Sequence, residues 1–235
     1  MLFRSASLLP SHGRGIWPRD VLKEVSRGLS RVEAGNPGFP RLVQAGKSVA
    51  VIGGGPGGLS AAYCLALMGH KVTVYEKRQK LGGMMRYGIP SYRFPREKLD
   101  AEIASILSLG IEVHTGVKVG NDISFEELTA KYDCLYLSIG AHTDKKVGIE
   151  GEDSKGVISA VQMLGQIGDE DMPDFTGKRV AVIGGGNVAM DVTRSAIRLG
   201  AEKVTCVYRR RIEDMTAQAE ECDASTLRYG REVHR

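Results

Sequence analysis

The 235-residue sequence lacks any Cys-x-x-Cys pair, and its four cysteines, Cys64, Cys134, Cys206 and Cys222, lie far apart. This spacing excludes the usual iron–sulfur and zinc ligand sets and a redox-active disulfide, so we predict no metal site. Three of the cysteines, all but Cys222, fall inside apolar helix or strand patterns and are predicted to be buried thiols of a cytoplasmic protein. No apolar run approaches the ~20 residues that a membrane-spanning helix needs, and we predict no membrane partner.

A strong excess of charge is also absent. The formal net charge is +4, and all of it lies in residues 1–46, which hold seven Lys and Arg against three Asp and Glu. The rest of the chain is neutral, so no nucleic-acid partner is predicted. We interpret residues 1–46 as an N-terminal extension, partly disordered, whose Arg- and Ser-rich start is either a targeting peptide or an artefact of a fragmentary gene.

Glycine, by contrast, is abundant, with 30 residues against the roughly 7% of average usage. Many of these glycines lie in two similar runs, VAVIGGGPGGLSAA at 49–62 and VAVIGGGNVAMDV at 180–192. Each run has the pattern of an apolar strand, a glycine turn and the beginning of a helix. One chain therefore contains two copies of the same kind of turn.

Strand and helix patterns alternate around both runs, which predicts an α/β fold with parallel sheets flanked by helices. We predict two tandem Rossmann-like dinucleotide-binding units, in residues 47–150 and 151–235, the second of them incomplete. Ser124 and Glu127 form a capping-box pattern at the start of one helix. Helices are predicted over 57–68, 95–109, 124–131, 159–166 and 187–199. Strands are predicted over 47–53, 70–77, 133–141, 178–185 and 202–211, and one or two strands over 111–120.

The first run contains the spacing G-x-G-x-x-G as Gly53, Gly55 and Gly58. In this motif the first glycine makes a tight turn, the second lets the backbone approach a pyrophosphate, and the third allows helix and strand to pack closely. Glu76 ends the next predicted strand, where a carboxylate accepts hydrogen bonds from a ribose diol. The motif with this acid predicts a site for FAD or NAD; the alternative is a glycine turn without a ligand.

The second run has Gly184 and Gly186, with Ala189 as the third small residue. Its following strand ends in arginines, and we place Arg209 and Arg210 at the position that meets the adenosine ribose. Guanidinium groups bind a 2′-phosphate bidentately, so this turn is predicted to bind NADPH. The alternative is that the arginines form a solvated charge run. Two turns with different ribose positions indicate a flavoprotein that takes hydride from NADPH.

Four stretches carry a more specific pattern: EKRQKLGGMMRYGIPSYRFPREKLDAEI, VKVGNDISFEEL, YDCLYLSIGAH and KRVAVIGGGNVAMDVTRSAIRLGAEKVTCVYRRRIEDM. Over about residues 46–215 they resemble the small (beta) subunit of glutamate synthase, a module shared with dihydropyrimidine dehydrogenase. The resemblance implies a two-domain NADPH- and FAD-dependent oxidoreductase. It also implies electron transfer to iron–sulfur centres of a partner, such as the large subunit of glutamate synthase.

The resemblance further implies roles for individual residues, and none of them is catalytic because the flavin supplies the chemistry. On the FAD pyrophosphate it places Gly53, Gly55, Pro56, Gly57 and Gly58, and at the adenosine ribose it places Glu76 and Lys77. Along the flavin side of the cofactor it places Gly83, Arg86, Ile89 and Pro90. It places Val119 at the adenine, and Gly140 where the end of a strand approaches the FAD. At NADPH it places Gly184, Gly186, Asn187, Val188 and Asp191 at the pyrophosphate turn and Arg209 and Arg210 at the 2′-phosphate.

The sequence also departs from that family. Residues 1–46 have no cysteine where family members carry an iron–sulfur domain, and the match fades at Thr216, where the family continues with proline. The expected return of the chain to the FAD domain is also absent, so we predict a truncated piece. Two alternatives stay open: a non-catalytic nucleotide-binding fragment, and an NADPH-dependent disulfide reductase, which would need a cysteine pair facing the flavin.

Overall fold

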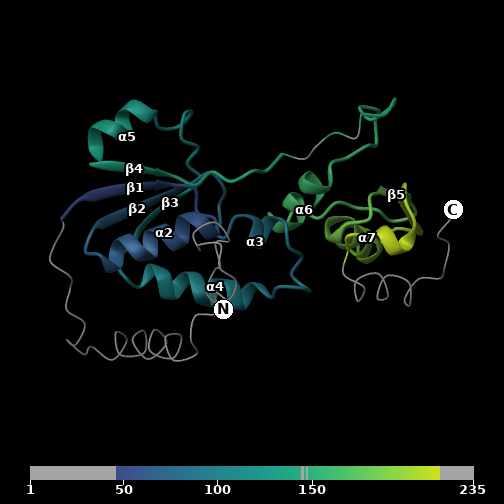
Figure 1. The fold of residues 1–235 in the computed structure, drawn as a ribbon, viewed down its shortest axis with the longest axis horizontal. Helices are drawn as coiled ribbons and strands as arrows, with labels where there is room; N and C mark the ends of the chain where they lie inside the picture. The colour runs from purple at the N-terminus through teal and green to yellow at the C-terminus, as the bar shows by residue number, and fades with distance from the viewer. Residues whose placement is uncertain (1–45, 144–145, 147, 218–235) are drawn as a thin grey trace. The chain divides into compact units, whose positions relative to one another are not determined.

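The computed structural model of the chain describes residues 46–143, 146 and 148–217 (Figure 1). The predictions for residues 1–45 and for Cys222 lie outside the described residues. Backbone contacts divide the chain into two units. The first holds the described residues up to Gly83 together with Glu97–Gly140, and the second holds Met84–Arg96 together with the described residues from Ala141 onward. This grouping differs from the predicted division at residue 150, because Met84–Arg96 packs with the later part of the chain.

The first unit is a parallel four-stranded sheet in the order β3-β2-β1-β4. Figure 1 shows α2 and α4 on one side of this sheet and α5 on the other. Successive side chains of a strand point to opposite faces of the sheet. On one face, Ala50, Ile52 and Tyr75 form a core cluster with Leu128 of α5. The elements are β1 (Ser48–Ile52), α2 (Pro56–Leu67), β2 (Lys71–Glu76), α4 (Arg96–Leu107), β3 (Glu112–Thr115), α5 (Phe125–Lys131) and β4 (Cys134–Leu137).

The second unit contains a parallel pair, β5 and β6, in the part of the chain that the structure describes. Its core joins Met163 and Leu164 of α6, Val182 of β5, and Met190 and Ala196 of α7. The elements are α3 (Met84–Tyr87), α6 (Ala160–Gly168), β5 (Arg179–Ile183), α7 (Asn187–Arg198), β6 (Lys203–Val207) and the short 3-10 helix η1 (Ile212–Asp214). The α/β fold class and the strand–turn–helix order of both glycine runs are therefore confirmed.

Serine caps confirm two predicted helix starts. Ser124 accepts a hydrogen bond from the Glu127 amide, while the Glu127 carboxylate accepts one from the Ser124 amide, so α5 has the predicted capping box. Ser159 caps α6 in the same way through the Gln162 amide. Across the described residues, no helix has the length and apolarity to cross a membrane.

The prediction that three cysteines are buried is wrong. Cys64 and Cys134 are exposed and Cys206 is half-buried. Helix α2 is apolar on nearly every side, so its sequence does not show that Gly58, Leu59 and Ala62 form the packed face and leave Cys64 outside. Strand β4, which contains Cys134, lies at the edge of the described sheet, and its residues are largely exposed.

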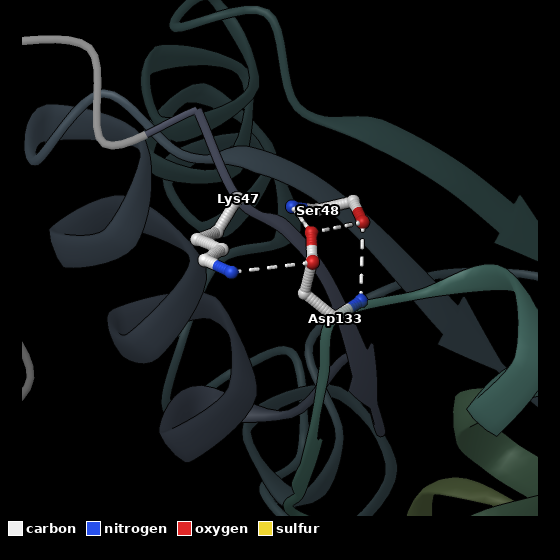
Figure 2. Close-up of polar contacts among 3 residues, drawn as sticks. All are labelled: Lys47, Ser48 and Asp133. Carbon is white, nitrogen blue, oxygen red and sulfur yellow. Dashed lines mark hydrogen bonds and ion pairs between the residues drawn. The ribbon is translucent and has the colours of Figure 1, made fainter.

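A polar brace joins the beginnings of β1 and β4 (Figure 2). The Asp133 carboxylate accepts hydrogen bonds from the backbone amide of Ser48 at 2.7 Å and from its hydroxyl at 2.8 Å. The Asp133 amide donates to the Ser48 hydroxyl at 3.1 Å, and the Lys47 ammonium lies 3.5 Å from the carboxylate. These bonds, led by the one from the Ser48 amide, lower the pKa of Asp133 below its ordinary value of 3.8.

We expect Asp133→Asn to lower stability at neutral pH and to remove part of its acid dependence. Because the folded-state pKa is lowered, the carboxylate stabilises the fold fully above the ordinary pKa, and this contribution is lost as the pH falls through the lowered pKa. Urea unfolding midpoints at pH 7 and at successively lower pH measure the effect. The difference between wild type and variant should vanish in acid. Asp153→Asn, which removes an exposed ion pair with Lys146, should change little at any pH; a constant gap for Asp133→Asn would contradict the account.

Candidate functional site

The first glycine turn follows β1 and leads into α2, and its glycines have different reasons to be glycine. Gly53 has φ +109°, and a Cβ there would overlap the Ser138 carbonyl oxygen. A Cβ on Gly58 would overlap the Gly53 carbonyl oxygen, so this position sets the close approach of α2 to the turn. The predicted roles of the first and third motif glycines thus have a structural basis within the chain itself.

Gly55 is different, because nothing in the part of the chain that the structure describes requires a glycine there. Its φ is −81°, a value open to any residue, and a Cβ would meet only the Gly83 Cα, at an ordinary 3.6 Å. The missing side chain therefore leaves backbone uncovered at the beginning of α2. That is the feature a turn needs if a pyrophosphate is to approach its amides closely.

The two helices that follow the glycine runs are capped differently from α5 and α6. Gly55 and Gly186 are the N-cap residues of α2 and α7, neither makes a side-chain cap bond, and neither helix has an acid in its first turn. The first amides of a helix have no intrahelical partner and carry partial positive charge. Pro56 occupies the first position of α2, where a missing amide costs nothing, and Gly57 lies against the Ser138 hydroxyl. Both helix ends are suited to phosphate groups.

Glu76 lies at the end of β2, beside the first turn, and its side chain is buried. One carboxylate oxygen accepts a hydrogen bond from the Gly54 amide at 2.7 Å, and the other accepts from the Arg78 amide at 2.8 Å. Each oxygen keeps a second lone pair that can accept from a ribose hydroxyl. Glu76 therefore shapes the turn as well as facing it, while Lys77 next to it is exposed.

We expect Glu76→Gln to destabilise the ligand-free chain as well as to weaken the site. A glutamine has one acceptor oxygen, so either the Gly54 or the Arg78 amide loses its partner, at a cost of about 1–3 kcal/mol. Urea unfolding without cofactor measures this loss. Glu112→Gln, at an exposed carboxylate on β3, is the control and should change the midpoint little. Equal midpoints for Glu76→Gln and wild type would show that the two hydrogen bonds do not stabilise the turn.

Other residues predicted at FAD are divided between the two units. In the first unit, the chain returns to the turn through the Gly82 amide, which donates to the Gly54 carbonyl at 2.8 Å. Gly83, with φ +51°, follows directly, and a Cβ there would lie 2.6 Å from the Gly55 Cα. Val119 packs at the margin of the α5 core cluster, and Gly140 has φ +68° after β4.

Arg86, Ile89 and Pro90 belong to the second unit, in the segment Met84–Arg96. Arg86 and Pro90 are buried and Ile89 is half-buried. The Arg96 guanidinium holds this loop by donating to the carbonyls of Met85 at 2.9 Å, Arg86 at 2.6 Å and Ile89 at 2.8 Å. The loop is therefore ordered by its own arginine rather than being an ordinary surface loop.

The second glycine turn repeats the hydrogen bonds of the first. The Gly184 amide donates to the Val207 carbonyl at 2.9 Å, as the Gly53 amide does to Tyr75 at 2.8 Å. Gly184 also has a left-handed φ of +139°. A Cβ on Gly186 would meet only the Thr216 hydroxyl, at 3.4 Å. The second motif glycine is thus uncovered in this turn too, and Asn187 and the exposed Val188 begin the helix after it.

The matching registers show that Tyr208, and not Arg209, takes the place of Glu76. Tyr75 and Val207 occupy equivalent strand positions, so the residues after them correspond. The Tyr208 ring covers Gly185, where a Cβ would lie 2.7 Å from it, and its hydroxyl donates to the Asp214 carbonyl at 2.9 Å. Arg209 and Arg210 follow as exposed residues. Counting from the strand end, rather than from the glycine, would have identified Tyr208.

Asp191, which was predicted at the pyrophosphate turn of the second site, forms an ion pair that the sequence did not suggest. It lies in α7 with its side chain only 6% exposed, and it forms an ion pair with Arg93 at 2.9 Å. The Tyr92 hydroxyl donates to the Asp191 carbonyl at 3.3 Å, and the Arg198 guanidinium lies over the Tyr92 ring at 4.0 Å. Burial raises the pKa of Tyr92 above 10.0, so its hydroxyl stays protonated. Sequence reasoning missed Arg93 entirely.

Comparison with known proteins agrees with this geometry. Residues 47–227 match the pyridine nucleotide-disulphide oxidoreductase family. The chain belongs to this family. The structure of FprA from Mycobacterium tuberculosis in complex with NADPH matches 76% of the chain with 25% identity and a TM-score of 0.65, and the match covers 46% of that protein.

Curated relatives within the family include subunits of larger oxidoreductases. The chain is 46% identical over 181 residues to the NADP(+)-dependent formate dehydrogenase subunit beta of Moorella thermoacetica. It is 35% identical over 195 residues to the glutamate synthase [NADPH] small chain of Escherichia coli, which confirms the resemblance. These matches cover 76% and 79% of the chain but only 26% and 41% of the relatives, so the chain spans less than half of either protein.

Proposed function

We propose that the chain binds FAD at the first glycine turn and NADP(H) at the second, as the nucleotide-binding part of an NADPH-dependent oxidoreductase. The observation that carries this proposal is the pair of uncovered glycines, Gly55 and Gly186. Each is the N-cap residue of its helix and makes no side-chain cap bond, and among the described residues neither position needs a glycine for packing. The residues present therefore fit two dinucleotides.

The residues at the ends of β2 and β6, the strands that follow the two glycine turns, favour different nucleotides. At the first turn the Glu76 carboxylate suits an unphosphorylated ribose and would repel a 2′-phosphate. At the second turn Tyr208 fills the corresponding place, and Arg209 and Arg210 supply cations that bind a phosphate with charge-assisted hydrogen bonds. When bound, FAD supplies a ring that accepts hydride from a nicotinamide and releases electrons one at a time. The protein's part is to hold and orient the two nucleotides.

The remaining assignments stay predictions that rest on the resemblance. They place Gly83, Arg86, Ile89 and Pro90 along the flavin, Val119 at the adenine, and Gly140 near FAD. A partner that accepts the electrons, either another subunit or an iron–sulfur protein like the glutamate synthase large subunit, is also part of the proposal. Its support is that one of the relatives described above is named as a subunit and the other as a small chain. A cytoplasmic location is proposed as well. It is supported by the three cysteines in the described part of the chain, Cys64, Cys134 and Cys206, which are thiols rather than disulfides.

We do not propose disulfide reduction, although the family name includes it. That reaction needs two neighbouring cysteines facing the flavin, whereas the four cysteines of the sequence are separated by long stretches of chain. The three described thiols belong to α2, β4 and β6, which are different elements.

Anaerobic titration of the FAD-saturated chain with NADPH tests the proposal. Bound oxidised flavin absorbs near ~450 nm, and the proposal predicts that this band bleaches with NADPH and much less with NADH, because hydride passes to the flavin. A chain that binds FAD but keeps its absorbance at saturating NADPH would instead be a non-catalytic nucleotide-binding fragment. A chain that retains no FAD would contradict the first site.

A further inference from the structure

The segment Met84–Arg96 leaves the first glycine turn and packs in the second unit. Gly83, the residue before it, lies against Gly55 of that turn. Tyr87 then packs on α6 so closely that a Cβ on Gly168 would lie 2.7 Å from its ring. The segment thus runs by chain continuity from the turn proposed for FAD to the helices beside the turn proposed for NADP(H).

Two arginines hold this segment in different ways. Arg96 donates to carbonyls of the segment itself, at Met85, Arg86 and Ile89, so these bonds help to set the internal shape of the loop. Arg93 instead reaches outside the segment to Asp191 of α7, at 2.9 Å. Removing Arg93 should therefore weaken the attachment of the segment to α7 without unfolding the loop.

The Arg93–Asp191 pair lies close enough to the beginning of α7 that a movement of this helix end would change the distance between the two side chains. Asp191 lies one helical turn after Asn187, the first residue of the helix, and its carboxylate is almost fully buried, while Arg93 is 27% exposed. Tyr92 adds a second attachment by donating to the Asp191 carbonyl, and Arg198 lies over its ring. The stability of a buried ion pair depends strongly on the distance between its two groups, because moving them apart leaves a buried charge without its counter-charge.

We propose that Arg93 and Asp191 are positioning residues that couple nucleotide binding at the beginning of α7 to the segment Met84–Arg96. This inference rests on the proposed function, because it takes NADP(H) to be the nucleotide at the second turn. Binding there orders the first turns of α7 and so fixes Asp191. Asp191 then holds Arg93, and with it the segment that continues from the first glycine turn. Neither residue needs to touch a nucleotide.

Hydrogen exchange of the whole chain with and without NADP⁺ tests the coupling, because it reports local opening segment by segment. In wild type we expect NADP⁺ to slow exchange at the beginning of α7 and also in residues 84–96. In Arg93→Met the protection of α7 should remain, while the protection of residues 84–96 falls at least about fivefold, the lower end of ordinary coupling between sites. Arg93→Lys, which keeps the charge, should recover part of it.

Two controls separate positioning from general stability. Lys146→Met removes an exposed ion pair with Asp153 in the same unit and should change neither response. Tyr92→Phe removes one hydroxyl and keeps the ring over Arg198, so it should weaken the coupling only partly. If Arg93→Met disturbs folding, the Lys and Phe variants still decide the question.

The outcomes distinguish this inference from the proposed function. Protection of α7 by NADP⁺ without protection of residues 84–96 in wild type would overturn the coupling and leave the NADP(H) site intact. Equal protection of residues 84–96 in wild type and Arg93→Met would also overturn it, since Arg93 would then be structural only. No protection of α7 in wild type would contradict the proposed NADP(H) site itself.

Discussion

Gly55→Ala should leave the chain folded and abolish FAD retention. Its backbone conformation accepts alanine, and the new methyl group would have only an ordinary contact with Gly83 in the protein. It would stand, however, where the proposed pyrophosphate approaches the amides of α2. Loss of two charge-assisted hydrogen bonds, each worth roughly 1.5–3 kcal/mol, weakens binding by about two to four orders of magnitude. Flavin stoichiometry after dialysis and the urea unfolding midpoint measure the two effects separately.

Two matched glycine variants make this result specific. Gly58→Ala places its methyl group on the Gly53 carbonyl oxygen, so it should destabilise the first unit itself, by about 1–3 kcal/mol or more. Gly186→Ala has room at the second turn and should lose NADP⁺ binding while FAD binding remains. Undiminished FAD binding by a folded Gly55→Ala chain would remove the first turn from the cofactor site.

Replacing Arg209 by Ser and Arg210 by Glu should reverse the nucleotide preference of the second turn. Both guanidinium groups are exposed after β6, next to Tyr208, which occupies the place of an acid. Loss of both charge-assisted contacts with a 2′-phosphate, at roughly 1.5–3 kcal/mol each, should weaken NADP⁺ binding by about two to four orders of magnitude. NAD⁺, which has no such phosphate, should bind equally well or better. The ratio of the two Kd values, measured by calorimetry at one ionic strength, is the quantity to compare.

Arg211→Ser is the matched control for this pair. Arg211 is the next residue and is also exposed, but its guanidinium lies 3.5 Å from the Asp214 carboxylate, so its loss should leave the preference unchanged. An unaltered Kd ratio in the double variant would mean that Arg209 and Arg210 form a solvated charge run. The NADP(H) assignment of the second turn would then fail.

Local patterns explain why so much of this architecture could be predicted from the sequence. The two strand–glycine–helix runs and the Ser124 capping box depend on residues that are neighbours in the chain, and the structure has them where they were expected. The position of Glu76 at the end of the second strand was also predicted, because the lengths of the intervening helix and strand fix how many residues separate it from Gly53. These features follow from spacing and backbone chemistry alone.

The contacts that sequence reasoning missed join residues far apart in the chain. Arg93 and Asp191 are separated by 98 positions, and no local pattern indicates that they pair. The exposure of Cys64 likewise depends on which face of a helix that is apolar nearly all round meets the sheet. The residue equivalent to Glu76 lies one position before Arg209, since β6 ends at Val207 and Tyr208 follows it. Only the strand register shows that Tyr208 corresponds to Glu76.

The central claim is that the two glycine turns are separate sites for two different dinucleotides. Equilibrium dialysis of the protein against FAD and NADP⁺ together tests this claim by measuring how many of each nucleotide bind per chain. The account predicts one FAD and one NADP⁺ per chain at saturation, with neither nucleotide displacing the other. It also predicts that Gly55→Ala loses only FAD and that Gly186→Ala loses only NADP⁺. Competition between the two nucleotides for one site, or the loss of both in either folded variant, would contradict it.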